Sequence, residues 1–435
     1  MTNTCKKIIP LGMLLLAACT SEDSMYVDAD IQTCPGSSFF DVPVAPPSEA
    51  SAPLSGISNE AIEGTNDFAV NFYLANSKET SENVCVSPFS VGNVLGMIAN
   101  GDKGESRDEI LQLLGFEKNS DGLEALNNHY QTLLSNLPNL DETACVFTNS
   151  LWRNDFVPVY SDFSNVISKY FYAVDIPFGP SGEDGKEAIN RFVRANTRGL
   201  IENFLDAPID SSIAFLNTAY FKGSWKYTFE KDLTDKGIFM NSDKSESKVD
   251  FMHTLTSCEY AVTECGYQAV RLPLGENGAN FYMTFMLPTT DANRPATNPD
   301  EVFDMNLLKE FDETFRQEMI LLTLPKFEAS TKNSNTIDIL KTLGLDKVCD
   351  PSVGIPNIVD YHDPFFLNCF IHATKLIVDE DGTEGAAASL GGMFESAGPD
   401  LPNGIREIVF DRPFGFMIQE RSTGAILFIG SVKKL

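Results

Sequence analysis

Four histidines are the residues of this 435-residue sequence best suited to acid–base chemistry near neutral pH: His129, His253, His362 and His372. A catalytic base works beside a nucleophile, a metal ion or a phosphate-binding loop. The sequence contains no Gly-x-Ser-x-Gly turn, no His-Glu-x-x-His pair and no Gly-rich phosphate loop. His372 lies in the apolar run NCFIHATKLIV, where a hydrogen-bonded core histidine is the usual case. These patterns predict that the protein is not an enzyme and needs no cofactor.

The cysteines do not predict a metal centre either. Of nine cysteines, Cys5 and Cys19 belong to the N-terminal segment, and the rest are an odd number without Cys-x-x-Cys spacing. This predicts neither a zinc cluster nor a dense disulfide framework. Cys85, Cys145 and Cys369 lie in apolar, strand-like runs and are expected to be buried thiols.

Acidic residues strongly outnumber basic ones. The sequence has 61 Asp and Glu against 32 Lys and Arg, a formal net charge of −29. Such a surface repels phosphate backbones and other polyanions, so we expect no binding of nucleic acid or heparin. The main consequence of the charge is solubility.

The N-terminal segment has the features of an export signal. Lys6 and Lys7 precede a short apolar run in residues 1–18, which is too short to span a membrane. The tetrapeptide LAAC, ending at Cys19, resembles the lipobox of bacterial lipoproteins, in which the cysteine is lipidated. An ordinary signal peptide is the alternative. The following TSEDS resembles an acidic surface-export tag, so we expect an exported lipoprotein of the outer membrane, exposed to the extracellular side.

The rest of the chain divides into a tether and one domain. Residues 19–58 are rich in Ser, Pro, Asp and Ala, as in a flexible tether, and residues 59–435 show no further linker and no internal repeat. Apolar spacing predicts helices at 61–77, 88–100, 105–115, 121–137, 160–171, 186–198, 300–314 and 332–343. Strands are predicted at 144–152, 213–221, 281–287, 319–327, 368–378, 407–411 and 414–430, the last as a hairpin. Helices gather early and strands late, which favours the α+β class.

Four segments of this domain resemble serpins in order and spacing: residues 83–116, 214–234, 378–390 and 408–432. The resemblance implies three β-sheets, eight or nine helices and a reactive loop at about residues 380–405. In serpins a protease cleaves this loop and is trapped as an acyl-enzyme when the loop inserts into the main sheet. Gly415 departs from the family, which prefers a large apolar residue there.

The segment VDEDGTEGAAASLGG (residues 378–392) resembles the hinge of inhibitory serpins. Alternate side chains of an inserting strand turn inward, and these would be the small residues Thr383, Gly385, Ala387 and Ser389. Proline is absent from residues 383–398, so each residue could donate a ladder hydrogen bond. A flexible linker would explain the small side chains but not their alternation. The expected hinge residues are Glu380, Gly382, Thr383, Gly385, Ala386, Ala387, Ala388 and Ser389.

Five further residues match positions where serpin sheets open. Ser87, Ser90, Asn217 and His372 fall on the family's shutter positions beneath the main sheet, and Trp225 falls on the breach, where insertion begins. Each has a plainer alternative. Ser87, next to Pro88, could be an ordinary helix cap, and Trp225 a core aromatic.

The scissile bond is less sharply defined. The usual loop length places it between Ser396 and Ala397, with Met393, Phe394 and Glu395 as alternatives. A small residue would suit an elastase-like or subtilisin-like protease, and Met393 or Phe394 a chymotrypsin-like or papain-like one. Lys and Arg are absent from residues 392–398, which argues against trypsin-like targets.

Two functions follow from the resemblance. The first is a monomeric suicide inhibitor of serine proteases, with papain-like cysteine proteases as further candidates. The second is a non-inhibitory serpin that acts as a cleavable binding or decoy protein.

Overall fold

The computed structural model describes residues 54, 56–78, 80–137, 144–209, 211–275, 280–288, 298–333, 336–360, 365–368, 370–382 and 405–435. Within these ranges it contains α1 (Asn59–Ser77), α2 (Pro88–Ala99), α3 (Glu105–Leu113), α4 (Ser120–Asn136), α5 (Ser161–Phe171), α6 (Gly182–Asn196), α7 (Met305–Thr314) and α8 (Thr336–Thr342). None of these helices has the length and apolar character needed to cross a membrane.

Polar side chains at the N-termini of the helices explain where several of them begin. Ser58, Ser87 and Asn119 each accept a hydrogen bond from a backbone amide three residues ahead, at the starts of α1, α2 and α4. Asp304 accepts hydrogen bonds from the amides of Asn306 and Leu307, two and three residues ahead, at the start of α7, so the helix expected at 300–314 is interrupted. The first turn of the predicted helix forms a separate 3₁₀ helix, η5 (Pro299–Val302).

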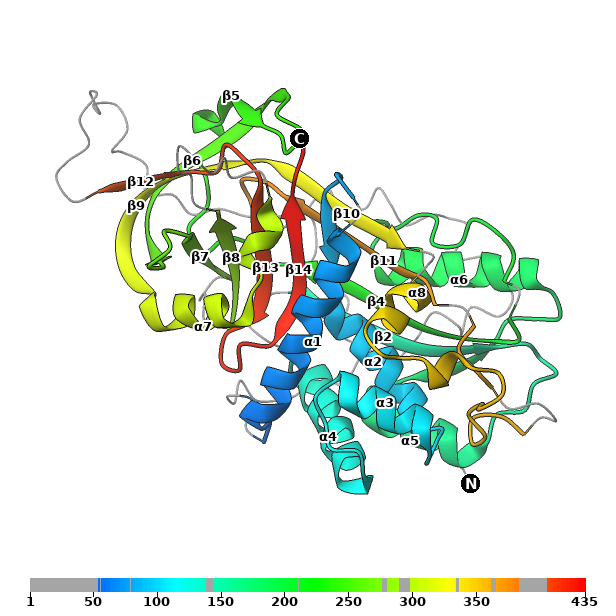
Figure 1. Ribbon diagram of the computed structural model, residues 1–435. Helices are drawn as coiled ribbons and strands as arrows, with labels where there is room; N and C mark the ends of the chain where they lie inside the picture. Colours follow the sequence, from blue (N-terminus) through cyan, green and yellow to red (C-terminus); the bar gives the residue numbers. More distant parts are fainter. Residues whose placement is uncertain are drawn as a thin grey trace, which may run out of the picture. The chain divides into compact units, whose positions relative to one another are not determined.

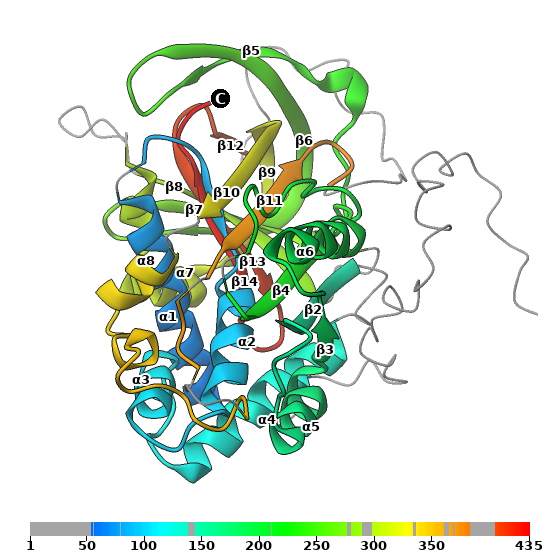
Figure 2. The ribbon, with the colours of Figure 1, turned by 90° about the vertical axis from the view of Figure 1, so that its right-hand side faces the viewer.

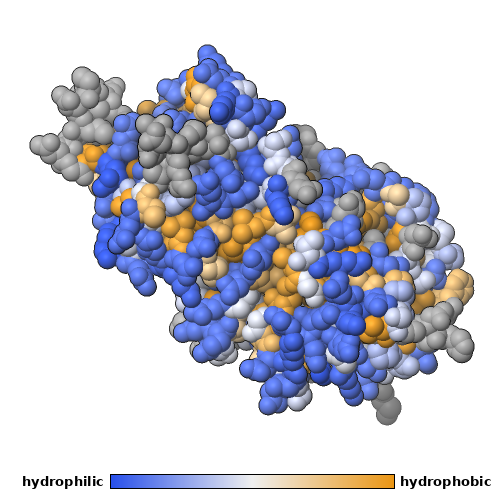
Figure 3. Space-filling model, in the orientation of Figure 1, coloured by the Kyte–Doolittle hydropathy of each residue, from blue (hydrophilic) through white to orange (hydrophobic). Residues whose placement is uncertain are grey.

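A nine-stranded sheet holds most of the core (Figure 1). Its order is β1 (Val84–Val86), β14 (Ile426–Val432), β13 (Phe414–Glu420), β8 (Phe281–Leu287), β7 (Gln268–Leu274), β6 (Glu246–Val262), β9 (Arg316–Pro325) and β12 (Arg406–Val409), and β5 (Asp235–Met240) pairs with β6. Every residue of β8, β13 and β14 is buried. Apolar side chains also gather over these strands on the face shown in Figure 3, whose margins are largely hydrophilic.

Two smaller sheets lie edge to edge, and we call them together the main sheet. One has the order β3 (Val174–Pro177), β2 (Ala144–Arg153), β4 (Ile213–Lys222), and the other pairs β10 (Phe327–Asn333) with β11 (His372–Val378). α2 contacts both β4 and β14, so it lies between the main sheet and the nine-stranded sheet. All its residues are buried, as expected for a helix that is apolar on every side.

β4 and β11 run side by side in the same direction. Ser211, before β4, donates to the Asn368 side chain before β11 (3.4 Å). Beyond the other ends of the two strands, Ser224 forms an isolated bridge with Gly382. Within the described residues no β-ladder joins β4 to β11. We call the line along which their two remaining edges face each other the seam.

The structure confirms the predicted fold class and changes the bounds of several predicted elements. The α+β class with three sheets is confirmed, and the described residues form eight α-helices. The strand expected at 319–327 is two strands, β9 and β10, and the helix expected at 332–343 begins later, because β10 extends to Asn333. Cys85 and Cys145 are buried as expected, and Cys369 lies outside the described residues.

Gly415 has a steric reason to be glycine. A Cβ atom at this position of β13 would lie 2.7 Å from both Phe303 Cζ and Val302 Cγ2. Both of those side chains are buried at the end of η5, so they already fill the space into which a large side chain at position 415 would point. The departure from the family pattern is therefore matched by neighbouring residues.

Replacing Gly415 with leucine should destabilise the native state by at least about 1–3 kcal/mol, because the side chain would overpack the core against Phe303. The melting temperature of the purified variant measures this. Met417→Leu, a change of similar volume two residues further along β13, is the control and should cost less than about 1.5 kcal/mol. Equal melting temperatures for the two variants would contradict the explanation.

Candidate functional site

The indole of Trp225 lies at the end of the seam, in the segment that follows β4. Its Nε1 donates to the Asp379 carbonyl (2.9 Å), and its backbone amide donates to the Asp381 carbonyl (3.4 Å). The amide of Phe229 donates to the Glu380 carbonyl (3.2 Å). Trp225 is buried, with its ring 6.1 Å from that of Phe229. The segment after β4 thus binds the residues after β11, at the position where the resemblance predicts the breach.

Glu380, expected as a hinge residue, is held by an ion pair. Its carboxylate accepts from Lys326 Nζ (2.7 Å) and from Thr234 Oγ1 (2.8 Å). Burial of the carboxylate would raise its pKa, but hydrogen bonds from Lys326, the backbone and Thr234 outweigh burial and leave the pKa below its usual range. Lys231 Nζ lies 2.5 Å from Asp381 Oδ2 in the same turn. The sequence analysis identified neither Lys326 nor Thr234.

Gly382 needs to be glycine where it stands. Its φ is +111°, in the region that side chains disfavour. An added Cβ would lie 2.5 Å from the Gly223 carbonyl oxygen and 2.7 Å from the Trp225 amide nitrogen. Gly382 also pairs with Asp379 in an antiparallel bridge, with hydrogen bonds of 3.1 and 3.2 Å. Residues 379–382 therefore form a tight turn that reverses the chain at the end of β11.

Ser87 and His372 meet on the core side of β11. The Ser87 amide donates to His372 Nε2 (3.1 Å), and Ser87 Oγ donates to the Leu427 carbonyl (2.8 Å). The same Oγ accepts from the Ser90 amide (3.3 Å), so Ser87 is also the helix cap that the alternative reading suggested. Ser90 Oγ is buried and has no hydrogen-bond partner within the described part of the chain.

Asn217 lies across the seam from this pair, in a separate row of amides. Its Nδ2 donates to Asn149 Oδ1 (2.7 Å), and Asn149 Nδ2 donates to Asn93 Oδ1 (3.3 Å) and to the Phe171 carbonyl (2.9 Å). Asn217 Oδ1 is buried and unpaired within the residues that the structure describes. The sequence analysis missed Asn93 and Asn149. The one available signal was an asparagine within the apolar run of α2.

Burial lowers the pKa of His372 to about 4, and burial does the same for His129. The native state therefore keeps both rings neutral, whereas a histidine in the unfolded chain titrates near pH 6.5. As the pH falls from about 6.5 to about 4, the unfolded chain takes up protons that the native state does not. Native stability should be fully present above pH 6.5 and then fall by about 1.4 kcal/mol per pH unit for each ring.

Melting temperatures measured between pH 7.5 and 4.5 test this pH dependence. The double variant His372→Asn, His129→Phe should show a flatter profile than the wild type, because it removes both buried titrations. An equally steep profile for the double variant would contradict the assignment.

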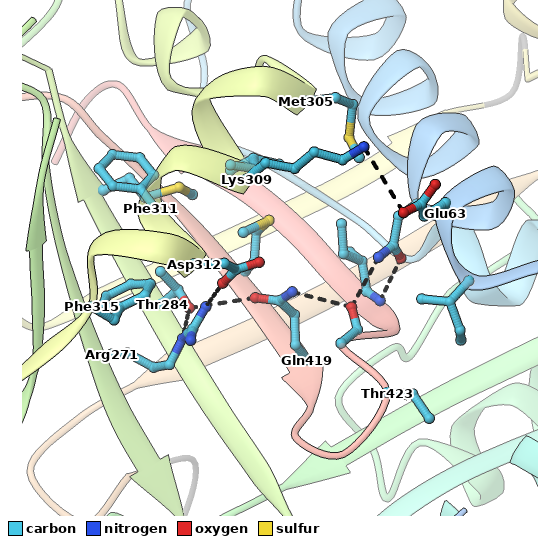
Figure 4. Close-up of a pocket in the computed structure, with 17 residues that line it drawn as sticks. Glu63, Arg271, Thr284, Met305, Lys309, Phe311, Asp312, Phe315, Gln419 and Thr423 are labelled. Atoms are coloured by element: carbon cyan, nitrogen blue, oxygen red, sulfur yellow. Dashed lines mark hydrogen bonds and ion pairs between the residues drawn. The ribbon is translucent and has the colours of Figure 1, made fainter. Parts of the chain in front are cut away.

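A cavity of about 200 Å³ lies between α1, α7 and the nine-stranded sheet (Figure 4). Its polar side chains pair with one another or with the backbone. Arg271 binds Asp312 (2.6 Å), Lys309 lies 3.9 Å from Glu63, and Gln419 donates to a backbone carbonyl (3.2 Å). The volume is below the usual range of ligand pockets, about 300–1,000 Å³. The cavity therefore offers little to a small-molecule ligand.

Other expected site residues lie outside the described ranges. These are the lipidation site Cys19, the hinge residues Thr383, Gly385, Ala386, Ala387, Ala388 and Ser389, and the candidate scissile residues Met393, Phe394, Glu395, Ser396 and Ala397. Their roles remain predictions.

Comparison with known proteins gives one consistent result. The model of the family "Serpin (serine protease inhibitor)" matches residues 63–435. Mouse alpha-1-antitrypsin 1-2 is 26% identical over 430 residues, covering 98% of each chain. The thermophilic serpin tengpin, in its native state, superposes with a TM-score of 0.76 at 24% identity, covering 91% of this chain and 98% of its own. For human thyroxine-binding globulin the TM-score is 0.75 at 22% identity, covering 88% and 99%. The family match covers most of the chain, and the chain belongs to the serpin family.

Proposed function

We propose that the protein is a suicide inhibitor of endopeptidases. The target's nucleophile would attack the scissile carbonyl, form an acyl-enzyme and release the new N-terminus of the loop. The cut loop would then enter the seam as a strand before water could hydrolyse the acyl bond. Family membership supports protease inhibition in general, and the trapping step is our inference.

The turn at residues 379–382 is the observation that carries the proposal. The Asp379–Gly382 bridge is antiparallel, and in an inserted loop it would be the first rung of a hairpin on the free edge of β11. Extending its register pairs Thr383 with Val378, and Ser389 with His372. Residues directly opposite each other share a face, and both Val378 and His372 are buried.

The same register places Gly385 and Ala387 opposite Leu376 and Thr374, which are also buried. The four inward positions that would lie opposite β11 are therefore all small, in agreement with the alternation seen in the sequence. Glu384 falls opposite Ile377, which is 40% exposed, so its charge would stay in water. Residues 383–389, the part of the loop that would pair with β11, are therefore suited to enter the seam without burying a charge.

We favour an elastase-like or subtilisin-like target cut at Ser396–Ala397, over a chymotrypsin-like or papain-like target cut near Met393 or Phe394. The usual loop length and the small side chain of Ser396 support this choice, and the absence of Lys and Arg from residues 392–398 argues against trypsin-like targets. We also propose that Cys19 anchors the protein in the outer membrane and exposes it to proteases outside the cell.

Incubation with elastases, chymotrypsin, cathepsin G, trypsin, subtilisin and papain tests the proposal, with a denaturing gel as the readout. We expect a complex that survives denaturation with at least one elastase-like or subtilisin-like enzyme. Mass spectrometry of the released C-terminal peptide identifies the scissile bond. Cleavage by every enzyme without formation of any complex would contradict the proposal that the protein traps proteases.

The alternative is a serpin that binds or decoys without trapping. Among the solved structures, human thyroxine-binding globulin is seen in complex with thyroxine. In this chain the cavity of Figure 4 is small and its polar groups are already paired, so it gives the alternative no support.

A further inference from the structure

The connection between α6 and β4 is fixed to α6. We call residues 197–209 of this connection the strap. The Asn190 side chain of α6 donates to the Leu205 carbonyl (2.9 Å) and accepts from the Leu205 amide (2.7 Å). Phe204 and Leu205 are buried in an apolar cluster with Trp152 of β2 and Phe192 of α6. The strap is thus part of the layer that α6 forms over the main sheet.

Lys332 of β10 binds the strap from the other side of the seam. Its Nζ donates to Asp206 Oδ2 (2.6 Å) and to the Asn203 carbonyl (3.0 Å). β10 pairs with β11, and the strap leads into β4, so these two bonds connect the parts of the main sheet that the seam separates. Figure 2 shows α6 close to both β11 and β4.

Apolar contacts follow the same path. Ala373 stands directly opposite Lys332 in the β10–β11 ladder, so the two side chains share a face. Ala373 and its neighbour Ile371 pack against the cluster that contains Phe204 and Trp152. The strap is therefore held to β10 and β11 by both a charged and an apolar contact.

We propose that Lys332 is a positioning residue that sets how fast the seam opens. An incoming strand must separate β4 from β11 beneath the strap, and this separation breaks the bonds of Lys332. Loss of the lysine would lower that barrier without removing any residue of the loop. The inference rests on the proposed function, in which faster insertion leaves less time for the acyl bond to be hydrolysed.

The expected size follows from exposure. The Lys332 and Asp206 side chains are 38% and 75% exposed, so the pair is screened by water and salt. Removing it should speed opening about two- to fivefold, and the gain should shrink in high salt. The melting temperature should change by no more than about 2 °C, because exposed pairs add little to stability.

The test is the rate at which intact protein takes up a synthetic peptide with the sequence of residues 383–395. Trp152 and Trp225, the only tryptophans of the chain, report uptake by fluorescence. We expect Lys332→Met to take up the peptide about two to five times faster than the wild type, and Lys332→Arg to match the wild type. Asp206→Asn should be intermediate, because the Asn203 carbonyl remains as an acceptor.

Lys375→Met is the matched control. Lys375 pairs with Glu328 (3.0 Å) between β11 and β10, on the same face as Lys332, but this pair does not cross the seam. The control should take up the peptide at the wild-type rate. Equal rates for Lys332→Met and Lys375→Met would overturn the inference, and so would a failure of the peptide to enter any variant.

The same variants separate this inference from the proposed function. If Lys332→Met takes up peptide faster but no protease is trapped by any variant, the proposed inhibitor function is contradicted and the role of Lys332 in opening the seam is supported. If proteases are trapped and the ratio of complex to cleaved protein does not depend on Lys332, the proposed role of Lys332 is contradicted and the inhibitor function is supported. If both hold, Lys332→Met should give more complex per cleaved molecule than Lys375→Met.

Discussion

Thr383→Arg should convert the protein from an inhibitor into a substrate of its target protease. Thr383 follows the Asp379–Gly382 bridge directly, and the extended register places it opposite Val378, which is 1% exposed. An arginine there would have to be buried without a partner for the strand to enter, at a cost of several kcal/mol. Insertion would slow by more than about 100-fold, so hydrolysis of the acyl-enzyme would be faster than insertion and would release the active protease.

Titration of the target protease with the variant measures this effect. The number of variant molecules consumed per protease should rise more than about tenfold, and the gel should show cleaved protein in place of the complex. Glu384→Arg is the control, because the same side chain one residue later falls opposite the exposed Ile377. If both arginines impaired trapping equally, the proposed register would be wrong.

Cleavage of the loop should raise the melting temperature by at least about 10 °C. An inserted strand would form ladder hydrogen bonds with both β4 and β11, on the order of ten bonds at about 0.5–1.5 kcal/mol each. This gain is comparable to the whole stability of an ordinary native domain. The intact protein is therefore expected to be held by a kinetic barrier rather than by the deepest minimum.

Calorimetry before and after limited proteolysis checks this prediction. Cleaved Thr383→Arg is the matched control, since it carries the same broken peptide bond but inserts its loop much more slowly and must bury an unpaired charge to do so. Its melting temperature, measured soon after cleavage, should therefore rise less than that of the cleaved wild type. A wild-type protein that melted no higher after cleavage would show that the loop does not enter the seam.

Local sequence patterns located most helices and several strands well. α2 begins at Pro88 because Ser87 and the proline together determine the start of the helix, and β8 matches the expected 281–287. The patterns failed where long-range pairing decides the structure. Residues 319–333 form one continuous extended run, and its division at Lys326 follows from two different partner strands, β6 and β11. β5 and the long β6 were not identified at all, since their polar, half-exposed residues show no clear alternation.

The site shows the same division. Family resemblance identified Trp225 and His372 because their neighbouring residues are distinctive. Lys326 and Asn149 could not be found in this way, because each gains its role from a partner far away in the chain: Glu380 for Lys326, and Asn217 for Asn149. A lysine between two strands and an asparagine within one look ordinary until the partner is placed.

The strand order also has a consequence for synthesis. β13 and β14 lie between β1 and β8, yet they are the last strands to leave the ribosome. The nine-stranded sheet therefore stays open until nearly the whole chain has been made, whereas β4, β11 and the loop emerge earlier. During synthesis, the loop would have the opportunity to insert between β4 and β11 before the nine-stranded sheet is complete. A protein with an open seam therefore requires the last two strands to dock before the loop inserts.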